Sequence, residues 1–225
     1  KIIPAAGGPR DIRAGDLDGD GEPDLAVSLY ISGEVGLWKG SAAGNYASVT
    51  RIPVRGPLPH KVRIADMNGD GKPDLVVSHC FTSDSIEVYY GDGDFRFPVS
   101  QEIMLGKDPR VLEDEIRDIV VDDFNRDGAP DIAAACHTSQ QVSVFINRPG
   151  AGSVSRSFAR EDYSFAKEGR PRALCVADLN QDGGKDLVVA LWGSNQVVFL
   201  LGAAPPPTPK QPSVAPAKPA PRKSR

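Results

Sequence analysis

The segment "DLDGDGEPDL", from Asp16 to Leu25, places five acidic residues in ten positions and leads directly into apolar residues. The same frame returns as "DMNGDGKPDL" from Asp66, "DFNRDGAPDI" from Asp123 and "DLNQDGGKDL" from Asp178. The starts at 16, 66, 123 and 178 are separated by 50, 57 and 55 residues. A frame that recurs at such a period indicates an array of similar structural units.

Each copy fits D-x-[DN]-x-D-G-x-x-D, with an oxygen-bearing side chain at loop positions one, three, five and nine. Calcium takes about six to eight oxygen ligands, and the glycine at position six permits the sharp turn that such a loop needs. A bound dication would neutralise carboxylates that otherwise repel one another, whereas a lone acidic turn could simply be solvated. We therefore predict Ca²⁺ at up to four sites, with the carbonyl of position seven as a backbone ligand. The predicted ligand sets are Asp16, Asp18, Asp20, Glu22 and Asp24; Asp66, Asn68, Asp70, Lys72 and Asp74; Asp123, Asn125, Asp127, Ala129 and Asp131; and Asp178, Asn180, Asp182, Gly184 and Asp186.

The residues around the loops predict strands rather than helices. An EF-hand needs a glutamate at position twelve, where this chain has Val27, Val77, Ala134 and Val189. The runs after the loops, "DLAVSLY", "DLVVSHC", "DIAAACH" and "DLVVALW", are short and apolar, as buried strands are. Each loop is therefore expected to join two strands.

The four loops, the "DLVV"-like strand after each loop and "GDGDF" at Gly91–Phe95 resemble FG-GAP or VCBS repeats. These repeats are the calcium-binding blades of integrin α-chain propellers and of many secreted bacterial and fungal proteins. The resemblance covers roughly residues 1–202 and implies a β-propeller whose blades each have four antiparallel strands. The G-x-G-x-F turn is clear in the second repeat, loose in "GSAAGNY" of the first, and lost in the third.

We predict an all-β fold, a β-propeller with four repeats in residues 1–202. With strands named A to D from the axis outward, the acidic loop joins A to B, and the fourth repeat stops after strand C. "KIIPA" at Lys1–Ala5 is expected to be the missing D strand, whose pairing with the last repeat would close a four-bladed ring and hide its edges. The alternatives are four blades of a larger propeller, or self-association of two chains to complete a larger ring.

Residues 203–225, "AAPPPTPKQPSVAPAKPAPRKSR", are predicted to be a disordered tail or linker, because this composition cannot bury apolar surface. The tail has five basic residues and no acidic ones, so the formal net charge of −4 becomes about −9 (−4 − 5) for the rest of the chain. Nucleic acid binding needs a basic face, and we do not expect it here. A carbohydrate or an extracellular protein is the expected partner.

The chain has no apolar run of about 18 residues, so no membrane span is expected. It begins with a strand-like segment instead of a signal peptide, which indicates mature or truncated material. Calcium loops of this kind suit an extracellular, secreted or cell-surface setting, with the periplasm as the alternative. Cys80, Cys136 and Cys175 lie in predicted strands, and their odd number predicts buried thiols rather than a disulfide framework.

A basic residue stands six positions before the first aspartate of every loop, at the start of strand A: Arg10, His60, Arg117 and Arg172. Strand B ends on the same face, where Tyr30 and Trp192 are found. Arginine and histidine bind hydroxyl or carboxylate groups, and aromatic rings provide apolar platforms. The sequence therefore predicts a ligand-binding face opposite the calcium loops.

Two other interpretations of this face stay open at this point. The basic residues can be solvated or paired with the inserted Glu113–Glu115, with the aromatic rings packed between blades. A zinc site of His79, Cys80, Cys136 and His137 has suitable donor atoms, but their spacing differs from that of compact zinc motifs.

An enzyme has less support from the sequence. The chain has no nucleophile elbow, zinc-protease motif or phosphate-binding glycine loop. A hydrolase or lyase would have to use His60, His79 or Glu113–Glu115. We therefore predict a module without enzymatic activity, with a secreted hydrolase or lyase, or a purely structural scaffold, as alternatives.

Overall fold

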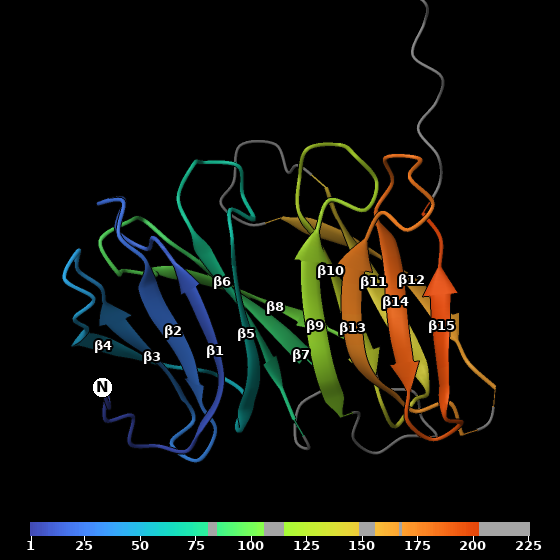
Figure 1. The fold of residues 1–225 in the computed structure, drawn as a ribbon, viewed down its shortest axis with the longest axis horizontal. Coiled ribbons are helices and arrows are strands. Elements are labelled where there is room, and N and C mark those ends of the chain that lie inside the picture. Colours follow the sequence, from blue (N-terminus) through green and yellow to red (C-terminus); the bar gives the residue numbers. More distant parts are fainter. Residues whose placement is uncertain (81–84, 106–114, 149–155, 167, 203–225) are drawn as a thin grey trace, which may run out of the picture.

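The computed structural model describes residues 1–80, 85–105, 115–148, 156–166 and 168–202, and every regular element in these ranges is a strand. The strands form three four-stranded antiparallel sheets and one three-stranded sheet, each with its strands in chain order. The sheets stand side by side in a row (Figure 1). This arrangement confirms the predicted all-β, propeller-like fold, and each sheet is called a blade below.

The strand bounds follow the predicted A-B-C-D order in every blade. Blade 1 contains β1 (Pro9–Gly15), β2 (Asp24–Leu29), β3 (Glu34–Lys39) and β4 (Ala47–Pro53). Blade 2 contains β5 (Pro59–Ala65), β6 (Asp74–His79), β7 (Ser85–Tyr90) and β8 (Val99–Met104). Blade 3 contains β9 (Ile116–Asp122), β10 (Asp131–Cys136), β11 (Gln141–Arg148) and β12 (Ser157–Ser164). Blade 4 contains β13 (Pro171–Ala177), β14 (Asp186–Leu191) and β15 (Gln196–Leu200).

The core is divided among the spaces between neighbouring blades, which we call interfaces 1/2, 2/3 and 3/4. Strands β6 and β7 of blade 2 are buried along their whole length, because blades cover both of their faces. This explains why the B strands read as continuous apolar runs instead of alternating ones. Strands β1, β5, β9 and β13 are neighbours along the inner side of the row (Figure 1).

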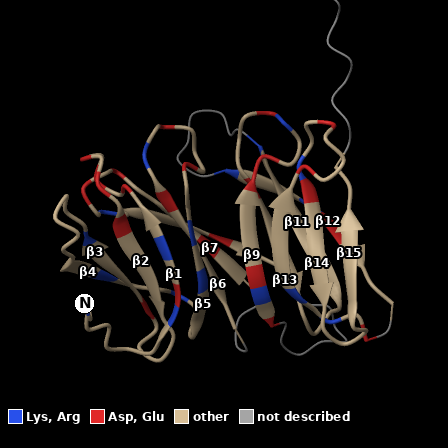
Figure 2. Cartoon of the chain, viewed as in Figure 1, with Lys and Arg blue, Asp and Glu red and all other residues tan. Residues whose placement is uncertain are grey.

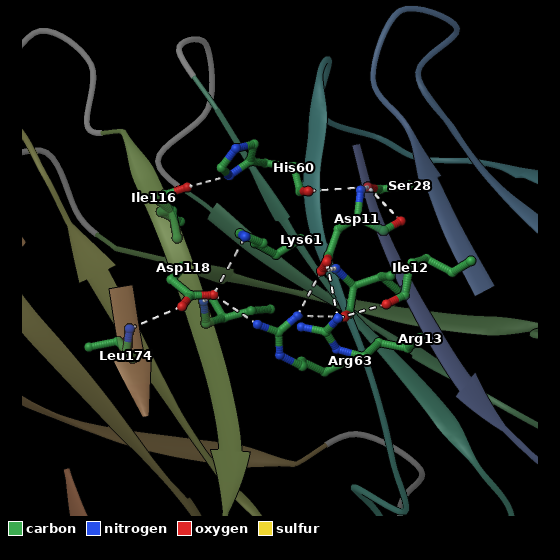
Figure 3. A network of polar contacts seen from close by, with 12 residues as sticks. Asp11, Ile12, Arg13, Ser28, His60, Lys61, Arg63, Ile116, Asp118 and Leu174 are labelled. Atoms are coloured by element: carbon green, nitrogen blue, oxygen red, sulfur yellow. Dashed lines mark hydrogen bonds and ion pairs between the residues drawn. The ribbon is translucent and has the colours of Figure 1, made fainter. Parts of the chain in front are cut away.

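A polar network joins the inner strands (Figure 3). Arg63 donates from Nη1 to Asp11 of blade 1 and from Nη2 to Asp118 of blade 3, at 2.8 Å in both cases. Each carboxylate also accepts a backbone hydrogen bond from the next blade in the row. Asp11 of blade 1 accepts the N–H of Val62 in blade 2 at 3.2 Å, and Asp118 of blade 3 accepts the N–H of Leu174 in blade 4 at 3.0 Å. One arginine and two carboxylates therefore connect all four blades.

The prediction that Lys1–Ala5 forms the D strand of the last blade is wrong. These residues form no strand, and the described part of blade 4 has three strands. Ile3 and Ala5 pack instead against Val27 and Trp38, on the outer side of blade 1. Apolar side chains are buried where uncovered apolar surface is nearest, which here is their own blade. The blades form an open row, with blades 1 and 4 at opposite ends, rather than a closed ring (Figure 1).

The remaining predictions about segments have mixed outcomes. Residues 203–225, the predicted tail, lie outside the described residues. Cys80 and Cys136 are buried as predicted, but Cys175 is exposed, because no described segment covers the outer side of blade 4. No helix in the described ranges is long and apolar enough to cross a membrane.

Candidate metal loops and basic face

All four acidic loops connect an A strand to a B strand, and they gather along one edge of the molecule (Figure 2). In the first loop, the two carboxylate oxygens of Asp16 accept the N–H groups of Gly19 and Gly21, at 2.7 and 2.9 Å. The carboxylates of Asp66 and Asp123 make the same pair of bonds, to positions four and six of their own loops. The position-one aspartate therefore folds the loop around its own side chain.

Positions three and five continue this pattern of side chain to backbone bonds. The Asp20 N–H donates to Asp18 at 3.3 Å, and the Glu22 N–H donates to Asp20 at 2.9 Å. The equivalent bonds in the other three loops measure 2.6 to 3.0 Å. One oxygen of each side chain is used in this way, which leaves Oδ2 of each position-five aspartate to face the loop interior.

A cationic side chain lies against the first loop. The Lys39 ammonium binds Oδ2 of Asp18 and lies 2.7 Å from Oδ2 of Asp20. Hydrogen bonds from the ammonium lower the pKa of Asp20, and the two carboxylates raise the pKa of Lys39. Carboxylate oxygens of Asp16, Asp18 and Asp24 lie within 4.8 Å of one another, the only such group among the described residues. Asp18 therefore belongs both to the lysine ion pair and to the cluster of three carboxylates.

In the other three loops an asparagine replaces Asp18, and its amide takes the place of the lysine. The Nδ2 groups of Asn68, Asn125 and Asn180 donate to the position-five aspartate at 3.1, 2.9 and 2.9 Å. Each amide presents one oxygen and one nitrogen, so it can offer its oxygen to a metal in place of this bond. The donor set of all four loops, carboxylate and amide oxygens, is the chemistry that calcium prefers.

The position-nine aspartates have a structural role that the sequence analysis missed. Asp24, Asp74, Asp131 and Asp186 are completely buried. Asp74 accepts the Met67 N–H at 2.8 Å and the Gly91 N–H at 2.7 Å, and the other three make the same two bonds in their own blades. Burial raises the pKa of Asp74 and of Asp131 to about 6. These carboxylates tie each loop to the end of strand C.

One pattern in the sequence could have revealed this contact between the position-nine aspartate and the end of strand C. The residue at the end of strand C that donates its N–H to this aspartate is Gly40, Gly91, Asn147 or Gly202. A Cβ at Gly40 would lie 2.1 Å from the carbonyl oxygen of Pro23, and one at Gly91 would lie 2.2 Å from that of Pro73. The recurring glycine therefore marks the close approach of strand C to the loop.

The four predicted basic residues lie at the opposite end of the A strands, but they differ in accessibility. Arg10 is exposed, with its guanidinium 5.4 Å from the centre of the Tyr30 ring. His60 is 5% exposed, and its Nδ1 is 3.1 Å from the carbonyl oxygen of Ile116. Burial lowers the pKa of His60 to about 4, and the neighbouring positive charges add to this. His60 therefore connects blades 2 and 3 as a neutral side chain.

The other two basic residues lie on blades 3 and 4. Arg117 is half-buried and bonds Glu115. Arg172 is exposed over Trp192, with 5.7 Å between its guanidinium and the ring centre, and Arg170 lies 5.9 Å from the same ring. Trp192 is 56% exposed. The described end of blade 4 thus combines an accessible indole with two guanidinium groups.

A hollow of about 480 Å³ adjoins this indole and is lined by Trp192, Gly193, Glu168, Arg170 and Asn195. Glu168, Arg170 and Asn195 have positive φ angles of 80°, 47° and 55°. A Cβ on Gly193 would lie 2.0 Å from the carbonyl oxygen of Glu168. Left-handed backbone of this kind persists where the surrounding structure enforces it, often at binding sites. Glu168, Arg170 and Asn195 were missed in the sequence, where only "GSN" and "EGR" mark turns.

The ion-pair interpretation of this face fits Arg117, which is paired with Glu115, whereas Arg10 and Arg172 lie over aromatic rings. His79 is buried, with Nε2 3.5 Å from the Glu87 carboxylate, and the one acidic group described above is the only cluster of metal-ligating residues in the described ranges. The zinc interpretation is therefore not supported. Of the suggested catalytic residues, His60 and His79 are buried, and Glu115 is half-buried and paired with Arg117. Glu113 and Asp114 lie outside the described residues.

Three solved structures share this fold at low sequence identity. A protein from Lactobacillus plantarum matches with a TM-score of 0.64 and 14% identity, over 88% of this chain and 52% of that one. A provisionally assigned 6-phosphogluconolactonase from Bacteroides uniformis gives 0.60 and 14%, over 86% and 53%. A catalytically inactive virginiamycin B lyase from Staphylococcus aureus, with quinupristin, gives 0.54 and 15%, over 90% and 55%. The chain thus spans about half the length of these proteins, and the likeness concerns the fold alone.

Sequence comparison identifies the repeats themselves. No curated protein matches the sequence. The family model for an FG-GAP-like repeat matches three times, over residues 16–77, 66–134 and 123–189. Each match begins at the first aspartate of an acidic loop and reaches into the next B strand, and together the matches cover most of the chain. The chain belongs to the FG-GAP-like repeat family.

Proposed function

We propose that this chain is a calcium-stabilised, extracellular binding module that recognises a carbohydrate or protein ligand through the end of the blades opposite the acidic loops. The proposal that calcium binds rests on the first loop, where the positively charged ammonium of Lys39 contacts the carboxylates of Asp18 and Asp20. In this proposal a metal ion would take the place of the ammonium group. A calcium ion would suit the same oxygens better than an ammonium group does, because it has twice the charge and binds about six to eight oxygen ligands.

In this proposal calcium has a structural role. Each loop joins strands A and B of one blade, so a bound ion fixes that junction. A ligand that binds only the native state stabilises it by RT ln(1 + [L]/Kd), about 2.7 kcal/mol per site at a hundredfold excess over Kd. Asp16, Asp66, Asp123 and Asp178, with their partners at positions three and five, are the side chains that would hold it.

Removal of calcium by a chelator tests directly whether bound calcium stabilises the fold. We expect the melting temperature to fall by several degrees when EDTA is added to the calcium-loaded protein, and to recover when calcium is added in excess. An Asp66→Ala variant should lose part of this shift, because one of the four loops no longer binds. A melting temperature that is the same in EDTA and in millimolar calcium would contradict the proposal.

Support for ligand binding comes from the Trp192 hollow. Its exposed indole, two guanidinium groups and the side chains of Glu168 and Asn195 place an apolar platform beside hydrogen-bonding groups. Sugar rings bind to such surfaces through their apolar faces, while their hydroxyls bond to polar side chains. We propose a carbohydrate as the first ligand to test, with an extracellular protein as the second.

A glycan array on the full chain tests ligand binding. Trp192→Ala should abolish any signal, because it removes the platform. Phe199→Ala provides a matched control: Phe199 is exposed on the same blade to nearly the same extent, 57% against 56%, but lies outside the hollow. Equal loss in both variants would show that the hollow is not the site. A blank array with the unmodified chain would favour protein adhesion or a structural scaffold.

The alternative function, a domain of a secreted hydrolase or lyase, shares its fold with the S. aureus lyase. No described residue favours it specifically, since the histidines proposed for catalysis are buried and bonded to neighbouring blades or side chains.

A further inference from the structure

Interface 3/4 contains an open groove of about 720 Å³ on the side of the acidic loops. Its floor is apolar and comes from both blades: Phe124, Val144 and Ile146 of blade 3, and Leu187 and Leu200 of blade 4. Leu201 and Gly202, at the end of the described chain, also line it.

The other two interfaces show what fills the corresponding space. In interface 1/2, Phe95 and Phe97 pack into the core from the segment that follows strand C of blade 2. In interface 2/3, Phe158 packs against the core from β12, the strand that follows strand C of blade 3. An aromatic side chain from the later blade therefore closes each of these two interfaces.

Among the described residues, no aromatic side chain from a segment after strand C of blade 4 packs into interface 3/4. The side chains that line the space reflect this difference. At loop position two, Leu17 of interface 1/2 and Met67 of interface 2/3 are 1% and 0% exposed, whereas Phe124 of interface 3/4 is only half-buried.

The rim of the groove has one basic side chain without an ion pair in the described residues. Arg126, Arg148 and Lys185 line the rim, together with one acidic residue, Glu161. Arg126 lies 3.5 Å from Asp182, and Lys185 lies 3.1 Å from Asp122. Within the described part of the chain, Arg148 makes no ion pair. The rim can therefore bind an acidic group beside the apolar floor.

We propose that this groove binds an extended segment of a partner polypeptide in which an aromatic side chain follows acidic residues. The segment that closes interface 1/2 has this composition: Asp92 and Asp94 precede Phe95 and Phe97 in "DGDFRF". The aromatic ring would take the place of the missing side chain, between Phe124 and Leu200. The acidic residues would face Arg148 on the rim.

The probe is a fluorescent, end-blocked peptide with the sequence DGDFRF, titrated with the full chain in millimolar calcium and followed by anisotropy. We expect saturable binding. A peptide with both phenylalanines changed to alanine should bind at least about tenfold more weakly, because buried aromatic residues carry most of the affinity of such contacts. Arg148→Glu should weaken binding several-fold. Arg51→Glu, which reverses another exposed arginine on blade 1, should have no effect.

The outcomes separate the possible occupants. No saturable binding, equal binding of the alanine peptide, or equal effects of Arg148→Glu and Arg51→Glu would each overturn the proposal. If the chain instead forms a dimer by sedimentation that Arg148→Glu dissociates, the occupant is a second copy and the peptide proposal fails. Circular dichroism of each variant establishes that the fold is retained, and Phe124→Leu, which shortens the floor, provides a second groove variant if Arg148→Glu does not fold.

Discussion

The ammonium of Lys39 lies 2.7 Å from a carboxylate oxygen of Asp20, a residue of the first acidic loop. The residue that corresponds to Lys39 is Tyr90 in blade 2, Ile146 in blade 3 and Leu201 in blade 4. Only the first loop therefore has a lysine at this position. That loop also carries an aspartate, Asp18, where the others carry asparagine. The additional carboxylate and the lysine therefore occur together, and the ammonium must leave before a metal can use the same oxygens.

Replacing Lys39 should strengthen metal binding at the first loop. We expect Lys39→Met to raise the calcium affinity of this loop roughly tenfold, since calcium no longer competes with a nearby positive charge. Calorimetric titration with calcium measures the change. Arg51→Met, which removes an exposed positive charge on β4, outside the acidic loops, should leave the affinity unchanged. Equal titrations of the Lys39 variant and the unmodified chain would contradict this role.

Removing the position-nine carboxylate should destabilise the fold even without metal. Asp74→Ala leaves the N–H groups of Met67 and Gly91 buried without acceptors, which costs about 2–5 kcal/mol of unfolding free energy. Asp74→Asn keeps one acceptor and should cost less. Urea unfolding in EDTA measures both effects separately from any loss of calcium. If Asp74→Ala is destabilising only when calcium is present, the residue acts as a ligand and not as a brace.

Acid should weaken the contact between blades 2 and 3. The pKa of His60 is about 4 in the fold, against 6.5 without burial, so the unfolded chain binds more protons between these values. Stability therefore falls as the pH is lowered from 6.5 towards 4, by up to about 3 kcal/mol from this residue. His60→Gln removes this contribution, whereas the nearby charges of Arg10, Lys61 and Arg117 remain. Urea unfolding at pH 7 and 4.5 should show a smaller difference for the variant, and an unchanged difference would disprove the assignment.

Arg63 should be the most important charge on the inner side of the blades. Its side chain is 12% exposed and bonds Asp11 and Asp118. Arg63→Met leaves these two carboxylates without their shared cation, and we expect a loss of about 3 kcal/mol. Arg13→Met removes a more exposed partner of Asp11, with 38% of its side chain accessible, and should cost below about 1 kcal/mol. Equal losses in urea unfolding would show that the network does not depend on Arg63.

The repeat frame predicted the strand order and the position of each loop, because loop chemistry and strand hydrophobicity are local properties of the sequence. The position of Lys1–Ala5 was not predictable in this way: its apolar residues suit a strand or a surface contact equally, and its position depends on which blade lies nearest. The burial of His60 was also missed, since its equivalents Arg10 and Arg172 are exposed and only the contact with Ile116 distinguishes it. The pairing of Lys39 with Asp18 was missed because both residues occur in the first repeat alone, so the other repeats offer no pattern for it.

Strand β15 lies at the outer end of the row and pairs with β14 alone among the described strands. Its sequence, "QVVFL", has no charge and no proline, and Val197 and Phe199 are 58% and 57% exposed. Natural sheets usually protect such an edge with lysine, proline or a covering segment, because it otherwise recruits strands from other molecules. Solutions of this chain should therefore become turbid with increasing concentration, and a lysine in place of Val197 should keep them clear.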